Sequence, residues 1–229
     1  MDKLLFDNKH YNTAGHAHEI TYSCYRRLPY FKDSIAWRIF LDSVRRAKIK
    51  FHFHLWAYVV MPNHVHLLIW PCERNYDIGK ILQAINGLMS RRYSRLLSRI
   101  NPDLKNSFLE IAQNHSVFRF WQRGGGFDRN LYNDNAIHAS ISYIENNPVR
   151  SNLVKQASEY RWSSAWESNN NKEKWLPALD RNSIPVKMVN RHRSAGHSAL
   201  TSAYNQRGAS PLRVDALRPV INCNCVTAR

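Results

Sequence analysis

The sequence has few acidic residues. Its 229 residues include 17 Asp and Glu against 33 Lys and Arg, a formal net charge of +16, and the pI is near 10.0. Such an excess is typical of proteins with a polyanionic partner, nucleic acid first and an anionic membrane surface second. Aromatic residues make up 12% of the chain, which argues against a disordered basic protein. The composition therefore favours a folded protein that binds nucleic acid.

Long apolar runs are also lacking. The stretches at 55–61 and 67–71 fall well short of the roughly 18 residues that span a bilayer. The first residues, MDKLLFDNKHYN, have neither the apolar core nor the cleavage site of a secretory signal. The four cysteines are too few and too scattered for a disulfide framework. We therefore expect no membrane partner and a reducing, cytoplasmic location.

The spacing of apolar residues predicts a mixture of strands and helices. Strands are expected at 18–26, 51–61, 64–70 and 116–122, with a shorter extended piece at 127–132. Helices are expected from Asp33 or Ser34 to about 50, at 76–100, and from Asn133 or Asp134 to about Asn147, where Pro148 ends the helix. This order predicts an α+β fold: an antiparallel sheet with helices packed on one face, in a ferredoxin-like arrangement.

The composition changes after Trp166. Residues 167–229 carry ten Lys and Arg against four Asp and Glu, and their apolar residues show poor periodicity. We interpret this stretch as a basic, loosely ordered C-terminal tail that orders on a partner.

Two histidines stand one residue apart in the stretch MPNHVHLLIW at 61–70. Residues i and i+2 of a strand point to the same face, about 6.6 Å apart at Cα. His64 and His66 could therefore share one metal ion. A second pair, His52 and His54, has the same spacing, and periodicity does not choose between the two pairs.

Tyr143 and Asn147, in SISYIENNPVR, are four residues apart and are expected to share one face of the last helix. This spacing places a phenol next to a carboxamide oxygen that could serve as a third metal ligand. Taken alone, Tyr143 would be an ordinary packed tyrosine and Asn147 a helix-ending residue.

Four segments in this order, WAYVVMPNHVHLLIWP, FWQRGGGFDRNLY, SISYIENNPVRSNLV and EYRWSSA, resemble the REP-associated tyrosine transposases of the HUH endonuclease superfamily. Val65 occupies the position of the large apolar residue between the two histidines. The resemblance runs from about Thr13 to Trp166, which implies a catalytic domain at 13–166 and the tail at 167–229. It also implies a prokaryotic, nucleoid-associated protein.

The resemblance implies cleavage and rejoining of single-stranded DNA at hairpins formed by palindromic repeats. It makes His64 and His66 the metal-binding pair, because His52 and His54 do not match the motif. Tyr143 would be the nucleophile, forming a 5′-phosphotyrosine. Asn147 would be the third ligand, where insertion-sequence relatives have glutamine. The expected cofactor is a divalent metal, Mg²⁺ or Mn²⁺: Mg²⁺ prefers oxygen ligands, and imidazole suits Mn²⁺ better.

Arginines are expected to hold the DNA backbone. Arg91, Arg95 and Arg99 recur every fourth residue and should form one ridge of the 76–100 helix. Further candidates, nearer the last helix, are Arg119, Arg123, Arg129 and Arg150. Tyr93 and Trp121 are candidates for base stacking, although core packing is the favoured role for Trp121.

Two alternatives remain open from the sequence. The first is a regulator that binds structured or single-stranded nucleic acid without cutting it, because charge and aromatic content would be the same. The second is a replication initiator or relaxase of the same superfamily, which the NNPV context and the short domain disfavour. The sequence does not choose between a monomer and a dimer.

Overall fold

The computed structural model describes residues 10–112, 115–124, 126–166 and 176–185. The chain divides into two compact units, Met1–Met188 and Val189–Arg229. All described residues belong to the first unit, and most of the expected tail lies outside them. Among the described helices, none combines the length and the apolar character that a membrane span requires.

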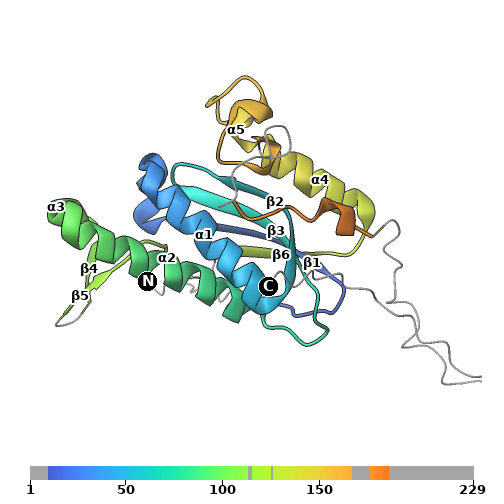
Figure 1. Cartoon of the computed structure of the whole chain (residues 1–229), viewed down its shortest axis with the longest axis horizontal. Coiled ribbons are helices and arrows are strands. Elements are labelled where there is room, and N and C mark those ends of the chain that lie inside the picture. Colours follow the sequence, from blue (N-terminus) through green and yellow to red (C-terminus); the bar gives the residue numbers. More distant parts are fainter. Residues whose placement is uncertain (1–9, 113–114, 125, 167–175, 186–229) are drawn as a thin grey trace, which may run out of the picture. The chain divides into compact units, whose positions relative to one another are not determined.

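A four-stranded antiparallel sheet forms the centre of the first unit (Figure 1). Its strands are β1 (Ala17–Ser23), β2 (Phe53–Val60), β3 (His64–Pro71) and β6 (Phe127–Leu131), in the order β2-β3-β1-β6. Helix α1 (Ser34–Phe51) connects β1 to β2, and α2 (Ile78–Ile100) follows β3. This order and connectivity confirm the predicted α+β class and its ferredoxin-like sheet.

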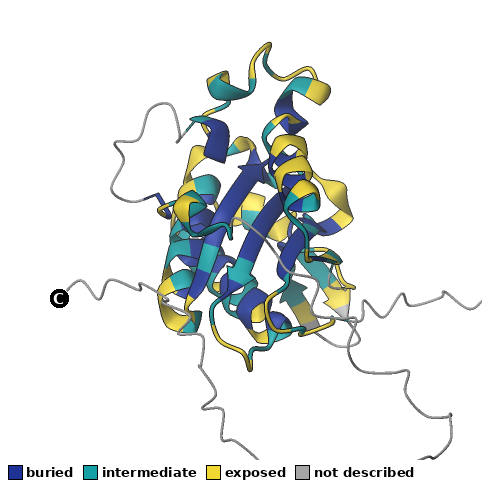
Figure 2. Ribbon diagram, turned by 90° about the vertical axis from the view of Figure 1, so that its right-hand side faces the viewer, coloured by how far each residue is buried: buried dark blue, intermediate teal, exposed yellow. Residues whose placement is uncertain are grey.

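Helices cover both faces of the sheet. Helices α1 and α2 pack side by side in the larger core cluster; the prediction of helices on one face holds for these two and not for α4. Helix α4 (Asp134–Glu145) lies on the opposite side, against β2 and β3 (Figure 1). It contributes Ile137, Ile141 and Ile144 to a second, smaller core cluster. The strands between these layers are largely buried (Figure 2).

The predicted helix starts follow capping chemistry. The Asp33 carboxylate accepts a hydrogen bond from the Ile35 backbone N–H at 2.9 Å at the start of α1. Asp77 accepts one from the Lys80 N–H at 3.1 Å at the start of α2. Each carboxylate satisfies a backbone donor that has no partner within the helix. The first and second predicted helices are therefore both present, with ends shifted by one or two residues.

The predicted strand at 116–122 is not part of the central sheet. Instead, β5 (His115–Phe118) pairs with β4 (Leu109–Ala112) in a separate two-stranded sheet that follows the short helix α3 (Pro102–Asn106). The fourth central strand is β6, which the sequence indicated only as a short extended piece. Gly126 makes this possible: its φ of +78° suits glycine, and a Cβ there would collide with the Thr21 carbonyl oxygen of β1.

The last predicted helix is two helices. Helix α4 ends at Glu145, Asn146 is its C-cap, and Asn147 begins the short α5 (Asn147–Arg150). Pro148 does not end a helix, because it lies in the first turn of α5, where its missing N–H costs no hydrogen bond. Tyr143 and Asn147 are therefore on separate helices.

Candidate nuclease site

His64 and His66 point to the α4 side of the sheet. Alternation along β3 explains this: Val65 and Leu67 pack with α1 and α2, whereas Leu68 packs with α4. The two imidazole centroids are 5.0 Å apart, with ring planes at 80°. The two side chains therefore project side by side. His66 is buried, with 4% of its surface exposed.

The Nδ1 atom of each imidazole has a fixed partner. His66 Nδ1 lies 2.7 Å from the hydroxyl of Thr21, its direct partner across the β1–β3 ladder. His64 Nδ1 lies 2.7 Å from the side chain oxygen of Asn63, which accepts a hydrogen bond from it. Hydrogen bonds at Nδ1 orient a histidine ring and select the tautomer whose Nε2 carries a free lone pair.

Burial keeps both imidazoles neutral. It lowers the pKa of His66 to about 3, together with the charge of neighbouring His64. Burial also lowers the pKa of His64, opposed by its hydrogen bond with Asn147 and reinforced by the charge of Arg27. Two neutral imidazoles near neutral pH are the protonation state that metal binding requires.

Asn147 lies beside the two histidines and is a third group that could bind a metal ion. Its side chain is buried, 8% exposed, and its amide nitrogen lies 3.1 Å from His66 Nε2. Turning the amide over exchanges nitrogen and oxygen, so the oxygen can be presented to an ion. No three His, Cys, Asp or Glu side chains gather as a metal cluster within the described part of the chain, so a third protein ligand beside the two histidines would be of another type, and this amide lies in contact with His66. Two imidazoles and one carboxamide oxygen fit Mn²⁺ better than Mg²⁺.

Tyr143 lies at the edge of this cluster. Its ring meets the His66 imidazole edge-on, with centroids 5.7 Å apart and planes at 83°. The Arg150 guanidinium also lies over the Tyr143 ring, 4.7 Å from its centroid. Tyr143 is 41% exposed, so a DNA strand can approach the phenol from solvent.

The alternative pair, His52 and His54, does not form a site. His52 is the C-cap of α1 in the left-handed conformation, with φ of +48°, and lies outside β2. Its Nδ1 is 3.6 Å from Glu73. His54 stacks on Trp70 with centroids 5.5 Å apart and has Asp180 within 3.7 Å. The two side chains therefore engage different partners.

The predicted DNA-binding arginines divide into three groups. Arg150 contacts Tyr143, and Arg129 pairs with Glu19 at 2.5 Å on the β1–β6 ladder. Arg119 and Arg123 both pair with Glu110, Arg123 at 3.0 Å, next to the small β4–β5 sheet. The structure does not bring these last two to the histidine pair.

Arg91, Arg95 and Arg99 are exposed on α2, as the predicted ridge requires. However, α2 packs on the face of the sheet opposite His64 and His66. These three arginines therefore cannot contact the same phosphate as the histidines. Of the two stacking candidates, Tyr93 is buried, and Trp121 packs against Tyr22, at 4.7 Å between centroids, and against further core aromatics.

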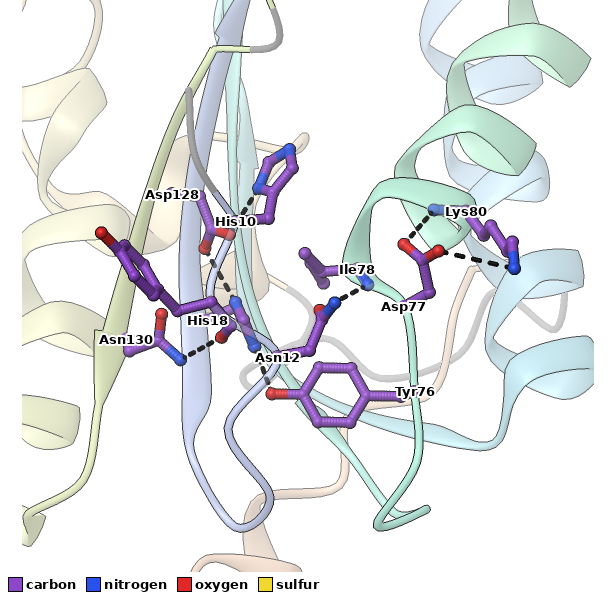
Figure 3. Close-up of polar contacts among 10 residues, drawn as sticks. His10, Asn12, His18, Tyr76, Asp77, Ile78, Lys80, Asp128 and Asn130 are labelled. Atoms are coloured by element: carbon purple, nitrogen blue, oxygen red, sulfur yellow. Dashed lines mark hydrogen bonds and ion pairs between the residues drawn. The ribbon is translucent and has the colours of Figure 1, made fainter. Parts of the chain in front are cut away.

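A buried polar network lies farther along β1, on the α2 side (Figure 3). Asp128 bonds Nδ1 of His18 at 2.8 Å and Nδ1 of His10 at 2.7 Å. His18 Nε2 lies 2.7 Å from the Tyr76 hydroxyl. A cavity of about 570 Å³ borders Tyr76 near the end of β3. His64, His66 and Asn147 do not line this cavity.

Sequence reasoning missed Thr21 and Asn63. Nothing in TYSC marks Thr21, because its role depends on the register that places it opposite His66. Asn63 precedes His64 directly, and a side chain oxygen beside a suspected ligand is a signal that could have been used.

The site therefore places two histidines on one strand of the sheet beside a tyrosine on a helix that packs against that strand. The chain belongs to the IS200-like transposase family, whose family model matches residues 12–147. Among solved structures, a REP-associated tyrosine transposase bound to a REP hairpin is similar in fold, with a TM-score of 0.52 and 18% identity over 82% of this chain and 97% of that one. A protein of Deinococcus radiodurans R1, described as a transposase, gives a TM-score of 0.38 and 24% identity over 60% of this chain and 95% of that one. No curated protein matches the sequence.

Proposed function

We propose that this transposase cuts and rejoins single-stranded DNA at hairpins, with Tyr143 as the nucleophile. The observation that carries the proposal is the edge-on contact of the Tyr143 ring with His66, at 5.7 Å between centroids. The two residues are 77 positions apart and lie on different elements. The chain belongs to a transposase family, so we interpret this contact as part of a DNA-processing site.

In the proposed reaction, the phenol oxygen of Tyr143 attacks a backbone phosphorus. The P–O bond to tyrosine forms while the P–O3′ bond breaks; the phenol loses its proton and the departing 3′ oxygen gains one. The product is a 5′-phosphotyrosine and a free 3′-OH. Because the phosphodiester is exchanged and not hydrolysed, a 3′-OH of another strand can reverse the step and rejoin the DNA without ATP.

The chain's own residues supply orientation and charge. Arg150, over the Tyr143 ring, would attract the phosphate that the phenol oxygen attacks. Thr21 and Asn63 hold the imidazoles through Nδ1, and burial keeps the imidazoles uncharged.

Transposases of this family are generally metal-dependent, and the donors present fit a divalent ion. His64, His66 and Asn147 would hold it. When bound, Mn²⁺ or Mg²⁺ would polarise the scissile phosphate and offset charge on its oxygens.

Hairpin DNA is the proposed substrate because the structurally similar REP-associated transposase was solved with a REP hairpin. The net charge of +16 supports a polyanionic partner.

The test is a covalent-adduct assay on single-stranded DNA that carries a hairpin, labelled separately at its 5′ and 3′ ends. With Mn²⁺, we expect a denaturation-stable adduct to the strand 3′ of the break, which carries the 5′-phosphate. We expect none with EDTA or with Tyr143→Phe. Binding without any adduct in Mn²⁺ or Mg²⁺ would support the non-cleaving regulator instead, and an adduct in Tyr143→Phe would remove Tyr143 from its role.

A further inference from the structure

A short segment beyond the family match is fastened to β2. The Asp180 backbone N–H donates to the Leu55 carbonyl at 2.9 Å, and the Asp180 carboxylate accepts from the Leu55 N–H at 2.9 Å. Lys48 of α1 donates to the Ala178 carbonyl at 2.6 Å and pairs with Asp180 at 2.7 Å. These contacts hold residues 178–180 in a fixed position on the sheet, although the sequence places them in the expected loose tail.

Arg181 follows directly and bridges two elements. Its Nε donates to the Trp56 carbonyl of β2 at 3.1 Å. One of its terminal nitrogens donates to the carboxylate of Glu145, the last residue of α4. The planar guanidinium has donors in a rigid fork, so Arg181 ties the end of α4 to the backbone of β2.

Ser164 provides a second connection between the same elements. Its hydroxyl donates to Glu145 at 2.7 Å and accepts from the Tyr58 N–H of β2 at 3.2 Å. A carboxylate at a helix C-terminus is unfavourable by itself, because the helix dipole is negative there. Glu145 is mostly buried, with a side chain exposure of 16%. The hydrogen bonds from Arg181 and Ser164 therefore account for the position of Glu145, whereas helix stability does not.

We propose that Glu145, Arg181 and Ser164 form a clip that positions Tyr143 for attack. The inference rests on the proposed function of Tyr143, which lies two residues before Glu145 on α4. Strand β2, to which the clip is anchored, pairs with β3 so that Val59 is opposite His66. The clip thus fixes the nucleophile's helix to the sheet that carries the histidines. Arg181 touches none of the reacting atoms, and it is a positioning residue.

The inference assigns a role in cleavage to residues outside the matched family segment, 12–147. A chain ending at Trp166 would keep His64, His66 and Tyr143 but would lack Arg181. Misplacement of a reacting group by about 1 Å can cost about a hundredfold in rate. Loss of the clip should therefore reduce the cleavage step and leave DNA binding largely intact.

The experiment compares full-length Arg181→Ala, Arg181→Lys and Glu145→Gln with wild type and with Arg46→Ala. Arg46→Ala is the matched control, because Arg46 also pairs with a carboxylate, Asp42 at 2.9 Å, but lies on α1. Single-turnover adduct formation at saturating hairpin DNA gives the rate, and fluorescence anisotropy in a Tyr143→Phe background gives the dissociation constant. We expect Arg181→Ala to slow the rate about tenfold or more with an unchanged dissociation constant, and Arg181→Lys to lose less. The double variant of Arg181→Ala with Glu145→Gln should be no slower than the worse single variant.

Hydrogen exchange of the peptide around 140–150 gives a readout that does not depend on activity. We expect faster exchange there in Arg181→Ala and Glu145→Gln, and wild-type exchange in Arg46→Ala. Wild-type exchange and rate in Arg181→Ala would overturn the clip while leaving Tyr143 as nucleophile. Equal losses of rate and DNA affinity would also overturn it, because Arg181 would then contact DNA. If wild type formed no adduct, the proposed function would fail, and the positioning role with it, whatever the exchange pattern. If Arg181→Ala does not fold, Arg181→Lys and Glu145→Gln decide by the same criteria.

Discussion

The Tyr143 ring meets the His66 imidazole edge-on, with centroids 5.7 Å apart. This contact joins α4 to β3 on the face of the sheet opposite α1 and α2. His66 is buried and Tyr143 is 41% exposed, so solvent reaches the tyrosine while the imidazole is largely covered. The nucleophilic role that we propose for Tyr143 requires such access from solvent.

The histidine pair should determine metal affinity. We expect His64→Ala and His66→Ala to weaken Mn²⁺ binding by about tenfold or more, because each removes one of the three proposed ligands. His52→Ala is the matched control and should bind as wild type does, since His52 is a helix cap beside Glu73. Isothermal titration with Mn²⁺ measures all three. Equal affinity in His64→Ala and His52→Ala would rule out the proposed metal site.

Thr21 should act through His66. Replacing Thr21 by Val keeps the shape but removes the hydroxyl that contacts Nδ1 at 2.7 Å. Loss of such an outer-shell partner typically costs about 10- to 100-fold in metal affinity, and we expect a loss at the low end of that range. Thr21→Ser retains the hydroxyl and should stay close to wild type. If the two variants bind Mn²⁺ equally well, Thr21 has no orienting role.

Arg150 should accelerate cleavage through its position over Tyr143. A cation at this position would offset charge that develops on the attacked phosphate, so Arg150→Ala should slow adduct formation severalfold at neutral pH. Arg150→Gln keeps some hydrogen bonding and no charge, and should resemble Arg150→Ala. Single-turnover rates test this. A rate in Arg150→Gln equal to wild type would show that the charge is not used.

The network around Asp128 should make stability depend on pH. Burial alone raises the pKa of Asp128, but hydrogen bonds and charge from His18 and His10 outweigh it, so the folded pKa is lowered. A lowered folded pKa contributes stability above the unfolded value of about 4. That stability is lost as the pH falls below about 4 toward the folded pKa.

Thermal unfolding between pH 6 and 3 measures this contribution. The midpoint of wild type should fall more steeply on acidification than that of Asp128→Asn, which has no titrating carboxyl at this position. Asp103→Asn changes an exposed carboxylate on α3 and should follow wild type. Parallel curves for wild type and Asp128→Asn would contradict the expected linkage.

Much of the fold could be predicted because local signals were strong. Asp33 marks the start of α1, and the alternating apolar residues around His64 and His66 mark β3. The fourth strand was misplaced because 116–122 has the better β composition, whereas the position of β6 depends on long-range pairing with β1 and on Gly126. Pairing of this kind is not encoded in any short window.

The candidate site shows the same division. His64, His66, Tyr143 and Asn147 could be named from motifs, and the structure brings them together. Thr21 and Arg181 could not, because their contacts arise from strand register and from the packing of a segment with poor periodicity. The ridge of Arg91, Arg95 and Arg99 was correctly placed on one helix face, but periodicity does not say which face of the sheet that helix covers.

Identification of the covalent linkage decides whether Tyr143 is the nucleophile. The hairpin reaction in Mn²⁺ is digested with protease and nuclease, and the nucleotide-bearing peptide is sequenced by mass spectrometry. We expect one modified peptide, with the phosphate on the Tyr143 oxygen, and no such peptide from Tyr143→Phe. A phosphate found on any other residue, or DNA cleaved with no protein-bound phosphate at any time, would contradict this expectation.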